Sequence, residues 1–263
     1  MAATQRSAAT HRTAADRPPR RRRRVQVTAV ILIALTAGGA CLAWTARHDT
    51  PGARPSAAQA RGTSSPATPI APSVGAATAP VAGLAGLGWT DFYGVELPVS
   101  RSAGPREVRG GLAWGFADTP LGALLAAVNI GVRANAQWGP GIFGPTIRGQ
   151  VTGPGASTLL AACQASYDQA SQAAGVPAGP LGRAYVTEEA FRWVTYTPTG
   201  AAVDIVSAGP GADGVTARAV TRIEVQWSGG DWRVIAPPGG DWGNSATPLT
   251  SLAGFTAFPA PHA

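Results

Sequence analysis

Carboxylates are the only side chains in the predicted globular region, residues 89–263, that could transfer protons. The region contains no lysine, and its one histidine, His262, is one residue from the C-terminus. Ser-His-Asp triads, Cys-His pairs, HExxH metal sites and lysine Schiff bases are therefore excluded. A carboxylate whose burial raises its pKa could still act as a general acid or base. The carboxylates that lie near apolar or aromatic residues are Asp168, Glu188, Glu189 and Asp204.

None of these carboxylates lies in a pattern that is specific to an enzyme. Strand alternation places Asp204 on the face opposite Val203 and Ile205, and that face is more often exposed to solvent. Glu188 and Glu189 look like a surface pair at the start of a strand. Cross-strand pairing with nearby arginines explains the charges without a ligand. We therefore expect no catalytic residue.

Signatures of cofactor and metal binding are equally weak. The pattern GxGxxG occurs at 139–144 and 209–214, but 34 glycines make chance matches common, and a proline in each removes a backbone donor. We interpret both as loops, because neither is expected between a strand and a helix. Cys163 has no base to activate it and falls on an apolar helix stripe, which favours core packing. We expect no cofactor and no metal ion.

Two helices are expected ahead of the strands. The first begins after Thr119, a cap residue that is followed by Pro120 at the first helical position. Its apolar stripe consists of Leu121, Leu124, Leu125, Val128 and Val132. The second runs from Ser157 to about Ala174, and Gly175 ends it.

After residue 190 the hydrophobic period changes from 3.6 to 2, which predicts strands. We expect them over residues 191–196, 201–207, 221–227 and 232–235. The turn 228–231 makes a hairpin of the last two. Helices first and antiparallel strands afterwards predict an α+β fold with the helices against one sheet face. We find no internal repeat.

The strong positive charge belongs to the N-terminal part of the chain. Residues 1–88 hold eleven arginines and two carboxylates, whereas residues 89–263 hold ten arginines and twelve carboxylates. The second region is therefore slightly acidic, and we expect it to bind no nucleic acid.

Residues 25–44 carry no formal charge and predict a transmembrane helix, since about 20 helical residues cross the roughly 30 Å hydrocarbon core of a bilayer. The basic run that sets its orientation consists of Arg20, Arg21, Arg22, Arg23 and Arg24. By the positive-inside rule, residues 1–24 form a cytoplasmic arm and the C-terminal part is exported. The alternatives are a signal cleaved after residues 38–40 and a lipoprotein signal at Cys41.

Residues 45–88 consist mainly of Ala, Pro, Ser, Thr and Gly. A segment of this kind buries too little apolar surface to offset its ordering entropy, so we interpret it as a disordered linker. It would hold an exported α+β domain, residues 89–263, away from the membrane.

Two stretches carry a family resemblance, namely GLAWGFADTPLGALLAAVN (111–129) and VTRIEVQWSGGDWRVIAPPGGDW (220–242). Together with the arm, the span and the linker, they resemble the bitopic scaffold proteins of bacterial conjugation and type IV secretion machines, including the TcpC-type proteins. These belong to the nuclear-transport-factor-2-like superfamily. The resemblance implies a cone-shaped domain of helices followed by a sheet, with transfer-apparatus proteins and further copies of the chain as partners. It supplies no catalytic residue.

The leading hypothesis is therefore a non-enzymatic, single-pass membrane scaffold of a conjugative DNA-transfer assembly. The alternative is a membrane-tethered cone domain that binds a small ligand or acts as an isomerase or dehydratase. That alternative predicts a deep apolar pocket in which Tyr167, Asp168 or Asp204 is the buried polar group.

Overall fold

The computed structural model describes residues 83–211 and 214–261. The predicted arm (1–24), the predicted span (25–44) and residues 45–82 of the predicted linker lie outside these residues. Within the described part of the chain, no helix combines the length and the apolar character needed to cross a membrane. The fold includes residues on the N-terminal side of Trp89, because Leu84 and Leu87 pack against the core.

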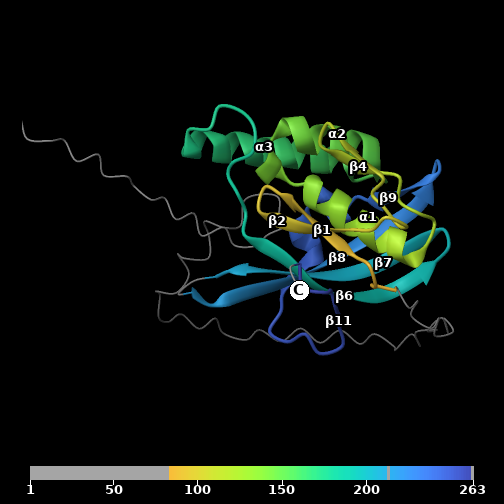
Figure 1. Cartoon of the computed structure of the whole chain (residues 1–263). Coiled ribbons are helices and arrows are strands. Elements are labelled where there is room, and N and C mark those ends of the chain that lie inside the picture. The colour runs from red at the N-terminus through yellow and green to blue at the C-terminus, as the bar shows by residue number, and fades with distance from the viewer. Residues whose placement is uncertain (1–82, 212–213, 262–263) are drawn as a thin grey trace, which may run out of the picture.

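A curled nine-stranded sheet dominates the described residues (Figure 1). Its main path has the order β1-β2-β6-β7-β8-β9-β5, while β10 pairs with β8 and β11 pairs with β6. Strands β6 to β9 form an antiparallel meander, and β2 and β5 pair in parallel with β6 and β9. The strands are β1 (Gly88–Phe92), β2 (Val95–Val99), β5 (Val151–Thr152), β6 (Val186–Thr197), β7 (Gly200–Pro210), β8 (Thr216–Ser228), β9 (Asp231–Ile235), β10 (Ala246–Pro248) and β11 (Thr256–Ala257).

Three α-helices cover one face of this sheet, which we call the inner face (Figure 1). Helix α1 (Pro120–Arg133) packs against β2, β7, β8 and β9, and α2 (Pro140–Gln150) and α3 (Ala156–Ala174) pack against each other beyond it. A separate hairpin, β3 (Glu107–Arg109) and β4 (Leu112–Trp114), leads into α1. The described residues also form the short 3-10 helices η1 (Ala136–Trp138), η3 (Pro238–Gly240) and η4 (Trp242–Ser245).

Helix α1 begins where its sequence predicts. The hydroxyl of Thr119 accepts a hydrogen bond from the backbone N–H of Gly122, and Pro120 occupies the first turn. The helix is buried from Gly122 to Arg133. Gly131 permits its close approach to β8, because a Cβ at this position would lie 2.8 Å from Cδ1 of Ile223. The second expected helix is also present, as α3.

The predicted fold class, an α+β cone of helices followed by a sheet, is wrong. Strands β1 to β4 precede the first helix, and strand residues outnumber helical residues in the described fold, nearly all of them in one curled sheet. The first two strands form a hairpin around Tyr93 and Gly94, both with positive φ (52° and 91°). Strand β2 pairs in parallel with β6, so the β1-β2 hairpin is part of the main sheet.

Two copies of the sequence Gly-Gly-Asp-Trp, at 229–232 and 239–242, hold the two ends of α1. In the first copy, Asp231 accepts hydrogen bonds from the backbone N–H groups of Gly115 (2.8 Å) and Phe116 (3.1 Å). Trp232 donates through Nε1 to the carbonyl of Ala117 (2.9 Å), just before the helix. In the second copy, the Trp242 Nε1 donates to the carbonyl of Ala134 (3.1 Å), at the helix C-cap.

The contacts of the first copy join the two stretches that carried the family resemblance. Both tryptophans are 1% exposed, so their rings also fill the core. The short repeat was not recognised in the sequence as a repeat. Its function in the structure is to fix α1 against the sheet at both ends.

The C-terminal segment crosses the face of the sheet opposite α1, which we call the outer face. It leaves β8 through β10, and it reaches the edge of β6 through β11 (Figure 1). Phe258 is buried, and its backbone N–H donates to the carbonyl of Glu189. Part of the outer face is therefore covered by the chain itself, and the rest forms the candidate site.

Candidate functional site

The candidate site is a row of three charged side chains on the outer face, which we call the arginine–aspartate row. Arg192 on β6, Asp204 on β7 and Arg222 on β8 are directly paired in the sheet register. Their neighbours Ile223 and Val203 point to the inner face and are buried. Period-2 alternation therefore delivers the three charges together to the opposite face.

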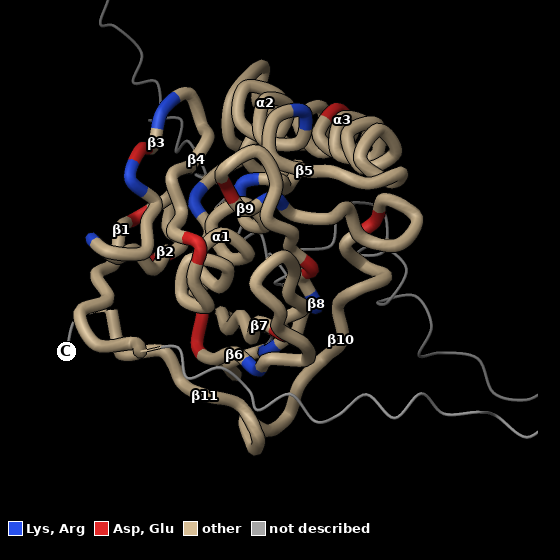
Figure 2. The backbone as a smooth tube through the Cα atoms, turned by 90° about the vertical axis from the view of Figure 1, so that its right-hand side faces the viewer, with Lys and Arg blue, Asp and Glu red and all other residues tan. Residues whose placement is uncertain are grey.

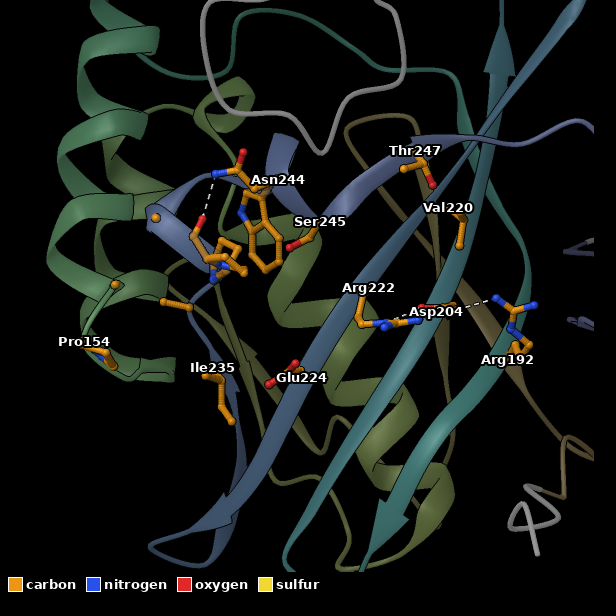
Figure 3. Close-up of a pocket in the computed structure, with 16 residues that line it drawn as sticks. Pro154, Arg192, Asp204, Val220, Arg222, Glu224, Ile235, Asn244, Ser245 and Thr247 are labelled. Atoms are coloured by element: carbon orange, nitrogen blue, oxygen red, sulfur yellow. Dashed lines mark hydrogen bonds and ion pairs between the residues drawn. The ribbon is translucent and has the colours of Figure 1, made fainter. Parts of the chain in front are cut away.

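The arginine–aspartate row is held together by charge-assisted hydrogen bonds (Figure 3). Arg222 donates from Nε to Oδ1 of Asp204 (2.9 Å) and from an Nη atom to Oδ2 (3.3 Å). Arg192 donates from an Nη atom to Oδ2 (2.7 Å), and its guanidinium also lies 4.4 Å from the ring centre of Phe255. Both oxygens of Asp204 are thus occupied.

The burial of the row is uneven, and this determines what it offers to a ligand. The Asp204 side chain is 4% exposed, while those of Arg192 and Arg222 are 47% and 49% exposed. Each guanidinium has five N–H donors, of which Arg222 uses two and Arg192 uses one on Asp204. The remaining donors are available on a pair of side chains that the buried carboxylate holds in position.

The pKa of Asp204 shows that the row is a fixed arrangement of charges. Burial alone would raise this pKa, but the hydrogen bonds and charges of Arg222 and Arg192 outweigh burial and lower it below the ordinary value. The hydrogen bond to Asp204 and the charges of Asp204 and Glu224 raise the pKa of Arg222, against a smaller effect of burial. The carboxylate therefore stays ionised near neutral pH, so it has no proton to donate as a general acid, and its lowered pKa makes it a weak base.

A cavity of about 680 Å³ opens over the row. Its floor is the outer face of β6, β7 and β8, and the segment from Ile235 to Thr247 forms its wall (Figure 3). A second cavity of about 490 Å³ continues along β7 and β8 and shares Arg222, Glu224 and Ile235 with the first. We call these two adjacent cavities the outer groove.

The outer groove combines charge with apolar surface. Its apolar contributions come from Val220, Ile235, Ala236, Pro237, Pro238 and Trp242. Glu224 lies two residues after Arg222 on the same strand and lines both cavities. Beside it, Ala202 occupies the paired position on β7, and this small side chain leaves space over the sheet.

The three residues predicted for a pocket do not meet. Tyr167 is buried on α3 and donates its hydroxyl to the carbonyl of Gly179 (2.8 Å). Asp168, the next residue, is exposed and accepts a hydrogen bond from Gln164 (2.8 Å). Only Asp204 lines the outer groove, and the expectation that it faces solvent is wrong, because it is 3% exposed.

Glu188 was expected at the surface, but the structure buries it. It is 2% exposed, and Oε2 accepts a hydrogen bond from the hydroxyl of Ser207 (2.7 Å). Burial raises the pKa of Glu188 to about 7, although the hydrogen bond from Ser207 acts in the opposite direction. Glu188 lines neither cavity of the outer groove. It is a titratable group within the packed fold, and no substrate reaches it through this groove.

A second buried polar cluster lies at the end of α1. Arg133 is 1% exposed, donates to the carbonyl and side-chain oxygens of Asn129 (3.0 and 2.8 Å), and stacks on Phe92 at 4.5 Å. Burial lowers the pKa of Arg133 to about 10. Asn129 in turn donates to the carbonyl of Pro98 on β2 (3.0 Å). This cluster attaches α1 to the N-terminal hairpin and lines neither cavity.

The glycine pattern at 139–144 and Cys163 both have structural roles. Residues 139–144 were expected to form a loop, but they make the first turns of α2, so that prediction is wrong. Gly139 is required there because a Cβ would lie 2.6 Å from the carbonyl oxygen of Gly179. Burial raises the pKa of Cys163 to about 12. Within residues 83–211 and 214–261, no three side chains of the metal-binding types cluster closely enough to hold an ion.

One family match covers most of the described fold and begins before it. A family model described as a domain of unknown function, DUF8175, matches residues 46–257. This match covers most of the chain, and the chain therefore belongs to the DUF8175 family. No curated protein and no solved structure matches the chain.

Proposed function

We propose that this protein is a non-enzymatic, membrane-anchored scaffold whose extracytoplasmic domain binds a partner protein in the outer groove. The observation that carries the proposal is the arginine–aspartate row, which presents two half-exposed guanidiniums in an open groove over a buried carboxylate that they keep ionised. A lowered carboxylate pKa suits binding and does not suit proton transfer. Glu188, whose pKa burial raises to about 7, lies in neither cavity of the groove.

The distribution of charge supports a protein partner over a nucleic acid. Arginines and carboxylates alternate over the described fold and do not form one basic face (Figure 2). A nucleic acid would need a continuous basic surface that neutralises several phosphates. The groove instead offers two half-exposed guanidiniums, one further carboxylate and an apolar wall. Interfaces between proteins have this mixed composition.

The membrane anchor and the assembly rest on the sequence. The basic run at residues 20–24 and the uncharged segment 25–44 support a single span with a cytoplasmic N-terminus. The resemblance of residues 111–129 and 220–242 supports a conjugative transfer machine as the assembly. In this proposal, the groove is the contact that recruits another component of the machine.

Deletion of the gene is expected to abolish or sharply reduce conjugative transfer of its element. The wild-type gene supplied in trans should restore transfer, because the defect is the loss of a scaffold and not of the transferred DNA. Mating assays measure the effect as transconjugants per donor. Unchanged transfer in a clean deletion would contradict the proposal.

Protease added to intact cells should digest the domain, and a protected domain would contradict the topology.

The groove itself is tested with a variant in which the whole row is neutralised, which we call the row-neutral variant: Arg192→Gln, Asp204→Asn and Arg222→Gln. All three residues are changed because removing the arginines alone would leave the buried Asp204 charge unpaired. Complementation by this variant is expected to fail at wild-type protein levels. Arg183→Gln also removes one net positive charge, from an exposed pair with Asp91, and should complement fully.

A further inference from the structure

The outer groove also indicates the chemical class of its partner, an inference that rests on the proposed function. We infer that the groove binds an extended segment of the partner protein that carries a carboxylate, which pairs with Arg192 and Arg222. Guanidinium pairs with carboxylate through parallel N–H···O bonds, and this geometry is specific for a planar, twofold acceptor. Both arginines retain such donors beyond those used on Asp204.

Asp204 makes this a prepared site. Asp204 accepts hydrogen bonds from both guanidiniums and thereby holds them in place. An incoming carboxylate would accept from the guanidinium N–H groups that do not bond to Asp204. Phe255 stacks on Arg192 and fixes it from a further side. Arginine side chains that are ordered before binding lose less conformational entropy when the ligand arrives.

The shape of the groove favours a chain over a compact anion. The cavities of about 680 and 490 Å³ share Arg222, Glu224 and Ile235 in their linings, so the charged row lies in a longer hollow of the sheet surface. Ile235, Ala236 and Pro238 supply an apolar wall on one side of the row. A free phosphate would occupy only the charged centre, whereas an extended segment would also use the wall and the second cavity.

Glu224 adds a second element of selectivity. It lies on the same face as Arg222, two residues along β8, and it is exposed. A carboxylate here would repel a segment with consecutive acidic residues and would attract a basic residue close to the bound acid. The occupant is therefore expected to carry one acidic residue with a basic neighbour.

The test uses the full-length protein in lipid nanodiscs and two pools of short random peptides, identical except for a fixed central glutamate or glutamine. Wild-type protein should retain the glutamate pool roughly tenfold to hundredfold better than the glutamine pool, because one charge-assisted hydrogen bond contributes about this factor to affinity. The row-neutral variant should lose this preference, and Arg183→Gln should keep it. Equal retention of the two pools by the wild type, or a preference that survives in the row-neutral variant, overturns the inference.

Two further arms identify the class of ligand. Sequencing of the retained peptides should show enriched Arg or Lys near the glutamate, and Glu224→Gln should remove that enrichment; its persistence overturns the role of Glu224. Inorganic phosphate should displace the peptides only weakly. If phosphate at equal concentration displaces them completely, the groove is a small-anion site and the assignment to a protein segment fails.

The peptide experiment tests the acidic partner segment, and the mating experiment tests the scaffold role. If the wild type shows no preference for glutamate while the row-neutral variant fails in mating, the acidic partner is wrong and the scaffold role stands. If the row-neutral variant supports normal transfer, the groove has no part in the proposed function, whatever the peptides show.

Discussion

Replacing Glu188 by glutamine is expected to stabilise the protein at pH 8 by about 3 kcal/mol, because the substitution removes a charge that the fold does not accommodate. Burial raises the pKa of Glu188 from its ordinary value of 4.5 to about 7. Between these two values the unfolded chain loses its proton while the folded chain keeps it. Stability contributed by the protonated group is therefore full below about pH 4.5 and falls as the pH rises to 7.

The expected curves can be measured by urea unfolding of the purified protein in detergent, followed by tryptophan fluorescence at several pH values. Wild type should lose stability between pH 5 and 8, and Glu188→Gln should lose much less, since glutamine can also accept the hydrogen bond from Ser207. Glu189→Gln is the matched control, because its carboxylate pairs with Arg218 at the surface and should matter by less than about 1 kcal/mol. Parallel curves for wild type and Glu188→Gln would contradict this account.

Replacing Trp232 by alanine is expected to lower the free energy of unfolding by about 3–5 kcal/mol, the usual cost of truncating a buried tryptophan. The side chain is 1% exposed, packs edge-on against Trp227 at 5.5 Å and anchors the start of α1 through Ala117. Trp232→Phe keeps most of the volume and loses the hydrogen bond, so about 1–2 kcal/mol is expected.

The same unfolding assay measures both variants. Tyr185→Ala serves as the control, because this side chain is 70% exposed and its loss should change stability by less than about 0.5 kcal/mol. A Trp232→Ala variant as stable as this control would show that the first Gly-Gly-Asp-Trp segment does not hold α1. The proposed partner groove lies elsewhere, so this outcome would leave the proposed function unaffected.

The sequence was sufficient to predict the helices and strands that have strong local signals. Helix α1 has a cap, a proline and a helical stripe, and β8 alternates between buried and exposed residues from Thr221 to Val225. Helix α2 could not be predicted because its sequence, PGIFGPTIRGQ, is rich in glycine and proline, which disfavour helix. Burial of Phe143 and Ile147 compensates for that preference, and such burial depends on the rest of the fold.

The candidate site was predicted in part, and the errors have identifiable causes. Alternation from Phe191 backwards places Glu188 on the outer face, but a β-bulge between Glu188 and Ala190 reverses the direction and turns it inward. The pairing of Asp204 with arginines on two other strands depends on the sheet register, which one sequence does not specify. The groove wall comes from residues 235–247, which no periodic pattern marked.

The two Gly-Gly-Asp-Trp segments also have a consequence for biosynthesis. Their partners on either side of α1 precede them by 115 and 108 residues, so translation reaches the helix long before it reaches the residues that secure it. A nascent chain that stops short of Gly229 has α1 without either attachment and without β9, one of the strands that cover it. Contacts between residues so distant in the sequence slow folding, so we expect α1 to reach its final position only after the last segment has emerged.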